Sequence, residues 1–205
     1  MSRRARIIVT VAIAAVLAAT AGTLAWRWLA PAAATTAGLQ RVILRYELAD
    51  AVSWPEGAYG RTRLTSAERD ELQTGYEDAL RASATGDVLR RGLAMRSWGF
   101  MQRQRTSYPR MLVTGAGGRI VYYDFVRRTI SGDLVVRALV QRFTDKANWR
   151  FSTGRLKRLG RDWWPTGLVM EYRLAKTVEG WRIAGVENLP LQFDAKTGAL
   201  IHGYP

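Results

Sequence analysis

The chain has 205 residues, of which 48% are hydrophobic and 23% charged, a composition that excludes a disordered protein. It contains no cysteine and a single histidine, so disulfide frameworks and thiolate metal sites are excluded, and few routes to histidine-based catalysis remain. The net charge of +14 favours an anionic partner such as lipid, acidic polymer or nucleic acid. Codon bias accounts for the preference for arginine over lysine, but not for the excess of basic over acidic residues.

The N-terminal segment predicts a membrane anchor. Residues 7–26 carry no charged side chain and directly follow three arginines. A helix of that length, at about 1.5 Å per residue, spans about 30 Å, the thickness of a bilayer's hydrocarbon core. Trp26 and Trp28 suit the membrane interface, and the preceding arginines favour a cytoplasmic N-terminus. Small residues from Ala30 to Ala34 leave a cleaved signal peptide as the alternative.

The anchor sets the expected organisation of the chain. We expect a cytoplasmic tail over residues 1–6, a transmembrane anchor over 7–28, a linker over 29–41 and an extracytoplasmic domain over 42–205. The expected location is therefore the cell membrane, with one span and the C-terminal domain outside the cytosol.

Helical signals come first in the predicted domain. Residues 39–64 fit either a strand or a continuation of the anchor helix. Thr65 and Glu68 have the spacing of a capping box, which predicts that a helix begins there. Gly86 is expected to end that helix, and Asp87 to cap a second helix that contains Leu93.

Strand signals follow from residue 111 onward. The glycine-rich run Gly115–Gly118 predicts a hairpin turn between two strands. Further strands are expected over residues 134–143, 149–159, 168–174 and 181–183. Helices followed by an antiparallel meander predict an α+β domain with helices packed on one face of a curved antiparallel sheet.

This order of elements resembles the nuclear transport factor 2-like superfamily. The sequence carrying most of the likeness is Glu171–Leu174, a turn at Glu179–Gly180, and then Trp181–Val186, which looks like the last hairpin of that superfamily. The likeness covers about residues 65–190. With one N-terminal span added, the chain is similar to single-pass proteins of bacterial secretion and conjugation machines, and to membrane proteins associated with Mce lipid-import systems. The resemblance implies a role in assembly rather than in chemistry.

The best candidate binding surface combines a basic run with two aromatic residues. Cations separated by leucines can lie on an anionic membrane or grip an acidic polymer, and two adjacent tryptophans suit a contact patch. The alternative is a solvated hairpin whose cations protect a sheet edge. The predicted binding residues are Arg155, Lys157, Arg158, Arg161, Trp163 and Trp164.

Two other features have a functional and a structural interpretation. Asp124 is the best available carboxylate for a buried catalytic base, but pairing with an arginine such as Arg137 on a neighbouring strand is the favoured interpretation. The arginines expected on the outward sheet face could form a cationic surface or pair with Glu171 and Glu179. These arginines are Arg137, Arg150, Arg173 and Arg182.

The predicted function is therefore a non-catalytic, membrane-anchored accessory protein of a bacterial cell-envelope transport or secretion (conjugation) system. No cofactor and no metal ligands are expected. The expected partners are the membrane, other membrane proteins of an envelope complex, anionic lipid and a second copy of the chain, whereas nucleic acid ranks below lipid. The alternative is an extracytoplasmic module that binds a hydrophobic ligand, an anionic lipid or an acidic envelope polymer.

Overall fold

The computed structural model describes residues 33–163, 166–194 and 200–203. The chain separates into two compact units, residues 1–36 and 37–205. The predicted anchor over residues 7–28 lies outside the described ranges. Within those ranges, no helix has both the length and the apolar character to cross a membrane.

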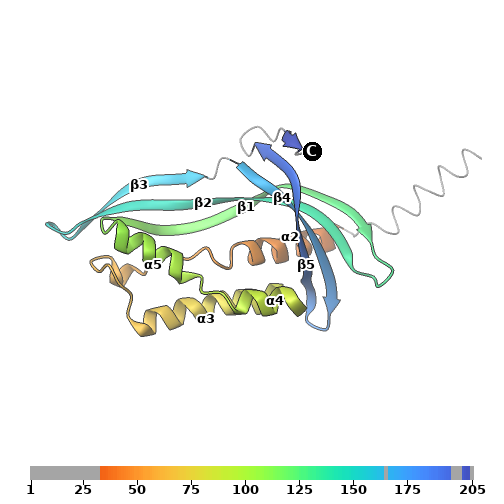
Figure 1. Ribbon diagram of the computed structural model, residues 1–205, viewed down its shortest axis with the longest axis horizontal. Coiled ribbons are helices and arrows are strands. Elements are labelled where there is room, and N and C mark those ends of the chain that lie inside the picture. Colours follow the sequence, from red (N-terminus) through yellow and green to blue (C-terminus); the bar gives the residue numbers. More distant parts are fainter. Residues whose placement is uncertain (1–32, 164–165, 195–199, 204–205) are drawn as a thin grey trace, which may run out of the picture. The chain divides into compact units, whose positions relative to one another are not determined.

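The second unit is an α+β domain, as the sequence predicts, with helices on one face of an antiparallel sheet (Figure 1). Its helices are α2 (Ala33–Glu47), the short 3-10 helix η1 (Glu56–Ala58), α3 (Ser66–Ser83), α4 (Gly86–Leu93) and α5 (Trp98–Ser107). Its strands are β1 (Met111–Arg128), β2 (Leu134–Arg150), β3 (Arg155–Trp163), β4 (Thr166–Thr177), β5 (Gly180–Asp194) and β6 (Leu200–Gly203).

The long strand β2 organises the sheet. Along one edge it pairs with β1 over nearly its whole length. Along the other edge its first residues pair with β4 and its last residues pair with β3. The sheet order is β1-β2-β4-β5-β6, and β3 lies beside the far half of β2.

The glycine-rich run is not a turn, and this prediction was wrong. Strand β1 runs without a break through Gly115–Gly118, paired with β2. A Cβ at Gly117 would lie 2.7 Å from the Phe143 ring, and one at Gly118 would lie 2.8 Å from the carbonyl oxygen of Gln141. The glycines are needed because neighbouring groups occupy the space of their missing side chains.

The helix starts were predicted in part. The Thr65–Glu68 capping box is present, with both reciprocal hydrogen bonds, and α3 begins directly after Thr65. Gly86 begins α4 rather than ending α3, so Asp87 lies in the first turn and is not the cap. A further helix, α5, begins at Trp98. The sequence pattern does not separate this helix from α4.

The folded body includes residues assigned to the linker. Helix α2 runs from Ala33 to Glu47, so the ambiguous stretch after residue 39 is helical up to Glu47. Leu39 and Ile43 on this helix are fully buried in the core, together with Leu134 and Leu174. The second part of the expected 29–41 linker therefore belongs to the domain.

Strand β4 contains a local change of phase. The alternating pattern predicts Leu168, Met170, Tyr172 and Leu174 on the inner face. Tyr172 and Leu174 are fully buried, but Leu168 is exposed and Val169 is buried in its place. The change coincides with a register shift against β5, where the single residue Val169 between Leu168 and Met170 stands opposite three residues of β5, 189–191.

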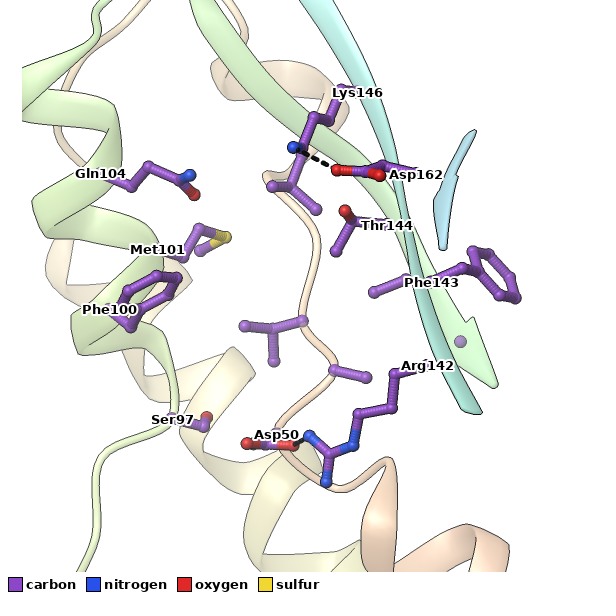
Figure 2. Close-up of a pocket in the computed structure, with 15 residues that line it drawn as sticks. Asp50, Ser97, Phe100, Met101, Gln104, Arg142, Phe143, Thr144, Lys146 and Asp162 are labelled. Atoms are coloured by element: carbon purple, nitrogen blue, oxygen red, sulfur yellow. Dashed lines mark hydrogen bonds and ion pairs between the residues drawn. The ribbon is translucent and has the colours of Figure 1, made fainter. Parts of the chain in front are cut away.

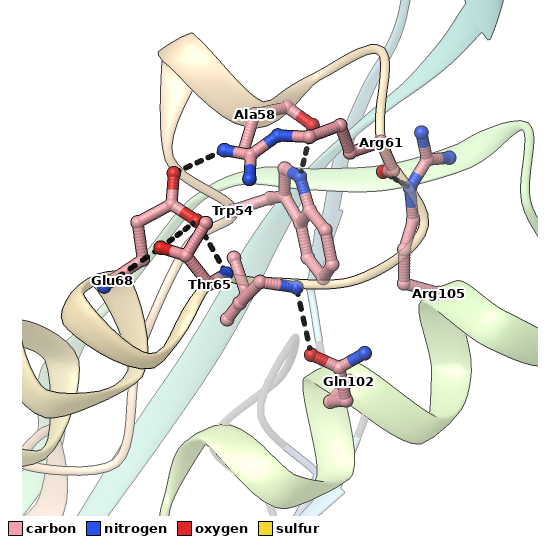
Figure 3. Close-up of polar contacts among 8 residues, drawn as sticks. Trp54, Ala58, Arg61, Thr65, Glu68, Gln102 and Arg105 are labelled. Carbon is pink, nitrogen blue, oxygen red and sulfur yellow. Dashed lines mark hydrogen bonds and ion pairs between the residues drawn. The ribbon is translucent and has the colours of Figure 1, made fainter.

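A buried arginine joins the helical layer to the start of the sheet (Figure 3). Arg105 on α5 is 2% exposed and donates hydrogen bonds to the carbonyl oxygens of Tyr59, Arg61 and Met111 at 2.7, 3.1 and 3.2 Å. Burial lowers the pKa of its guanidinium. Trp54 lies close by and donates its indole N–H to the carbonyl of Ala58. These bonds fix the loop between α2 and α3.

Candidate functional site

The predicted basic run forms the edge strand β3. Arg155, Lys157 and Arg158 are exposed, and none of them has an ion-pair partner in the described part of the chain. In the described residues β3 pairs with β2 alone, so its outer edge carries no neighbouring strand. The run is therefore an edge strand on which three of the four cations face solvent, a placement that fits both the predicted binding surface and the alternative of cations that protect a sheet edge.

Arg161 differs from the other cations of the run because it is paired. It donates to both carboxylate oxygens of Asp145 on β2, at 2.8 and 3.0 Å. This bidentate pair lowers the pKa of the Asp145 carboxyl. The guanidinium carbon also lies 3.7 Å from the centre of the Phe143 ring. The Arg161 side chain is thus held on the sheet surface by Asp145 and Phe143.

Trp163 belongs to the same surface, whereas Trp164 lies outside the described residues. The Trp163 ring is half-buried and packs on Phe143, with ring centres 4.8 Å apart. Arg119 on β1 stacks on Trp163 at 4.9 Å and donates two hydrogen bonds to the side chain of Gln141. We call the residues Arg119, Gln141, Phe143, Asp145, Arg161 and Trp163 the aromatic–cation cluster.

Sequence reasoning found Arg161 and Trp163 but missed the β1 and β2 members of this cluster. Phe143 and Trp163 face each other across β2 and β3, as do Asp145 and Arg161. These pairs follow from strand register, which the local pattern does not give. A local signal was the glycine-rich run itself, because the missing side chains of Gly117 and Gly115 make room for the Phe143 ring and the Asp145 side chain.

A second polar group, also missed, lies between α2 and the inner sheet face. Glu47 accepts a hydrogen bond from the buried Tyr172 hydroxyl at 2.8 Å and another from Arg142 at 3.0 Å. Arg142 also donates to Asp50 at 2.9 Å. Burial opposes the charge on Arg142, but Asp50 and Glu47 outweigh it and raise its pKa. Burial, followed by the charge of Glu47, raises the pKa of Tyr172.

This polar group borders a cleft of about 520 Å³ between α5 and β2 (Figure 2). Phe100 and Met101 on α5 form one wall, and Arg142, Thr144 and Lys146 on β2 form the opposite wall. Lys146 pairs with Asp162 at 2.8 Å. Because both of its cations already have carboxylate partners, the cleft is suited to an apolar or uncharged ligand more than to an anion.

An adjoining cleft of about 580 Å³ lies between α4 and α2 and is also lined by Asp50, Ser97, Phe100 and Arg142. The Ser97 hydroxyl is buried and has no hydrogen-bond partner in the described residues. Phe100 is 69% exposed, so a large apolar ring stands open at the rim of both clefts.

The catalytic and cationic-face hypotheses are not favoured by the geometry. Asp124 is exposed on β1, opposite Arg137 on β2, so it lacks the burial that a catalytic base in an apolar cone needs. Arg137 pairs with Glu171 at 3.1 Å, Arg182 with Glu179 at 3.2 Å, and Arg173 with Asp133 at 3.5 Å. Most of the expected cationic face is thus neutralised, and only Arg150 has no ion pair in the described ranges. Within those ranges, no group of three His, Cys, Asp or Glu residues could hold a metal ion.

Comparisons with known proteins leave the family open. No family model matches the chain, and no curated protein matches it. Among solved structures, the chain is similar to the intermembrane space region of the chloroplast protein ARC6, with 12% sequence identity and a TM-score of 0.33. That alignment covers 78% of this chain and 98% of the other. A likeness of this size supports no conclusion about function.

Proposed function

We propose that this chain is a non-catalytic, single-pass accessory protein of a bacterial cell-envelope transport or secretion (conjugation) system. Its domain belongs to the nuclear transport factor 2-like type and stands outside the cytosol, and its β3 edge contacts an acidic segment of a neighbouring membrane protein. The observation that carries the proposal is the edge of β3, which within the described ranges has no neighbouring strand and carries three exposed cations without ion pairs.

Two physical arguments support β3 as the contact. An edge strand presents unpaired backbone N–H and C=O groups, to which an extended segment of another protein can add as a further strand. The cations Arg155, Lys157 and Arg158 favour an acidic segment there and disfavour pairing with a second copy of the same strand, because like charges would meet.

The experiment is site-specific photo-crosslinking in intact cells at native abundance. A photoreactive residue at Lys157 is compared with one at Asp78, whose exposed side chain lies on α3. We expect Lys157 to crosslink to one or a few membrane proteins, and Asp78 to give no such product. Replacing Arg155, Lys157 and Arg158 together with serine should reduce the crosslink from a fourth position on β3, Leu159, which is 51% exposed. If neither Lys157 nor Leu159 gives a crosslink to a membrane protein, the proposal is contradicted.

The second candidate function is a binding module for a hydrophobic ligand, which the paired clefts beside α5 favour. The exposed Phe100 ring and the unpartnered Ser97 hydroxyl give the clefts an apolar wall and one free polar group. Native mass spectrometry of the full chain in detergent tests this function. Met101 is 5% exposed and lines the cleft between α5 and β2. The function is supported if a small molecule is retained by the wild-type protein and lost when Met101 is replaced by tryptophan. An empty wild-type protein counts against it.

A further inference from the structure

Two aliphatic side chains stand fully exposed at the tips of two hairpins. Ile130 lies in the turn between β1 and β2 and has 110% of its reference exposure, and Val178 lies in the turn between β4 and β5 and has 105%. Turns usually carry small polar residues, glycine or proline. Single exposed apolar residues need no explanation, but two fully exposed β-branched residues at turn tips call for a shared cause if the tips lie together.

The two tips do lie at the same end of the sheet. Leu134 at the start of β2 pairs with Leu174 in β4, and the two strands are antiparallel. Ile130 precedes Leu134 by four residues, and Val178 follows Leu174 by four residues. Both hairpins therefore extend past the same point of the sheet, in the same direction and by the same length of chain. Figure 1 shows both turns at the same end of the sheet.

Helix α2 begins at this end as well (Figure 1). Leu39 packs in the core cluster with Leu134 and Leu174, whereas Glu47, further along α2, reaches Arg142 further along β2. The predicted anchor ends at residue 28, so four residues, 29–32, lie between it and Ala33. The five Cα–Cα steps from residue 28 to Ala33 reach at most about 18 Å. If the chain is anchored as proposed, the start of α2 lies within that reach of the membrane surface.

The charge around the tips suits an anionic membrane. Arg127, Arg128 and Lys176 flank the tips and are exposed. The two acidic residues of the turns, Asp133 and Glu179, are each paired with an arginine. Among the described residues that directly flank the two tips, the charges without an ion pair are therefore positive, and they attract anionic headgroups.

We propose that these two tips form a membrane-docking surface. Ile130 and Val178 enter the interfacial region of the bilayer in which the chain is anchored, while Arg127, Arg128 and Lys176 contact the phosphates of anionic phospholipids. The inference rests on the membrane anchor in the proposed function. Docking holds the domain in one orientation, with the turn between β2 and β3 at the far end of β2 directed away from the membrane, where β3 can meet a neighbouring protein.

The absence of native cysteine allows a direct test. The variants Ile130→Cys and Val178→Cys are compared with Ser152→Cys, an exposed position in the turn between β2 and β3 at the opposite end of β2. Each full-length variant carries an environment-sensitive fluorophore and is reconstituted into phosphatidylcholine vesicles that contain phosphatidylglycerol. We expect a blue shift of the label, and several-fold stronger quenching by lipids spin-labelled near the headgroup, at positions 130 and 178 but not at 152.

The outcomes separate the two proposals. If the protein floats with the vesicles but all three labels are quenched equally weakly, the docking proposal is wrong, whereas the proposed membrane anchor is supported. If the protein does not float, the proposed membrane anchor is wrong, and the docking proposal, which rests on it, is wrong as well. Vesicles of phosphatidylcholine alone should weaken the quenching at 130 and 178. A response that appears only after a membrane-protein extract is added would assign the tips to a protein partner and overturn the inference.

Discussion

Glu47 is the residue on which the polar contacts between the helical layer and the sheet converge. Its two carboxylate oxygens accept hydrogen bonds from Tyr172 on β4 and Arg142 on β2, so one side chain on α2 joins two strands. The Glu47 side chain is partly buried, and a carboxylate removed from water needs partners that replace the lost hydration. Each of these partners should therefore be costly to remove.

Replacing Tyr172 with phenylalanine should destabilise the domain by about 1–3 kcal/mol, because a hydrogen bond to a charged acceptor is lost while the buried ring is kept. Urea unfolding of the full chain in detergent measures the change. The control is Tyr108→Phe, since the Tyr108 ring is 63% exposed. Equal unfolding midpoints for wild type and Tyr172→Phe would show that the bond contributes nothing.

The capping residue Glu68 predicts a dependence of stability on pH. Its hydrogen bonds from the Thr65 backbone and from Arg61 lower the pKa of its carboxyl below the ordinary value of 4.5. A lowered folded-state pKa gives stability that is fully present above 4.5 and is lost as the pH falls through the folded value. In the variant Glu68→Gln, the side-chain amide oxygen can still accept a hydrogen bond, but the side chain no longer titrates. The stability difference from wild type should thus be largest at neutral pH and shrink below about pH 4. A difference that stayed constant with pH would contradict this account.

At the scale of elements, the packing of α4 on α3 depends on a glycine. A Cβ at Gly92 on α4 would lie 2.7 Å from a methyl group of Leu80 on α3, which is 3% exposed. Gly75 on α3 is a matched contrast, because nothing lies within 4 Å of a Cβ placed there.

The two glycines should respond to alanine in opposite directions. In both helices alanine gains about 0.5–1 kcal/mol in helix propensity. At Gly75 that gain should appear in full. At Gly92 overpacking against Leu80 costs about 1–3 kcal/mol, which outweighs the gain and gives a net loss. Thermal unfolding of the two variants beside wild type measures both effects. A gain in stability for Gly92→Ala would show that α4 can move away from α3.

At the scale of the whole molecule, the proposed topology predicts where protease can reach the chain. Protease added to intact spheroplasts of the native host should degrade the domain over residues 37–205, because the proposed anchor would place that domain outside the cytosol. A cytosolic protein serves as the control and should survive. Full-length chain that persists until detergent is added would contradict the proposed location, and with it the role in an envelope machine.

The sequence by itself determined the α+β class and the position of several elements. The capping box at Thr65, the turn before Leu134 and the alternation through Tyr172 and Leu174 are local signals, and each appears in the structure. The basic run of β3 was also found from the spacing of its cations in the sequence. These features were predictable because hydrogen bonds and side-chain periodicity within a few residues set them.

Only the tertiary structure decided how distant residues meet. The path of β1 through Gly115–Gly118 depends on Phe143 in the next strand, and the burial of Val169 in place of Leu168 depends on a register shift against β5. The pairing of Arg161 with Asp145, the contacts of Glu47 and the shared end of the Ile130 and Val178 tips likewise follow from strand register. Register is set by the packing of the whole sheet, because shifting a strand by one residue reverses every side chain on it.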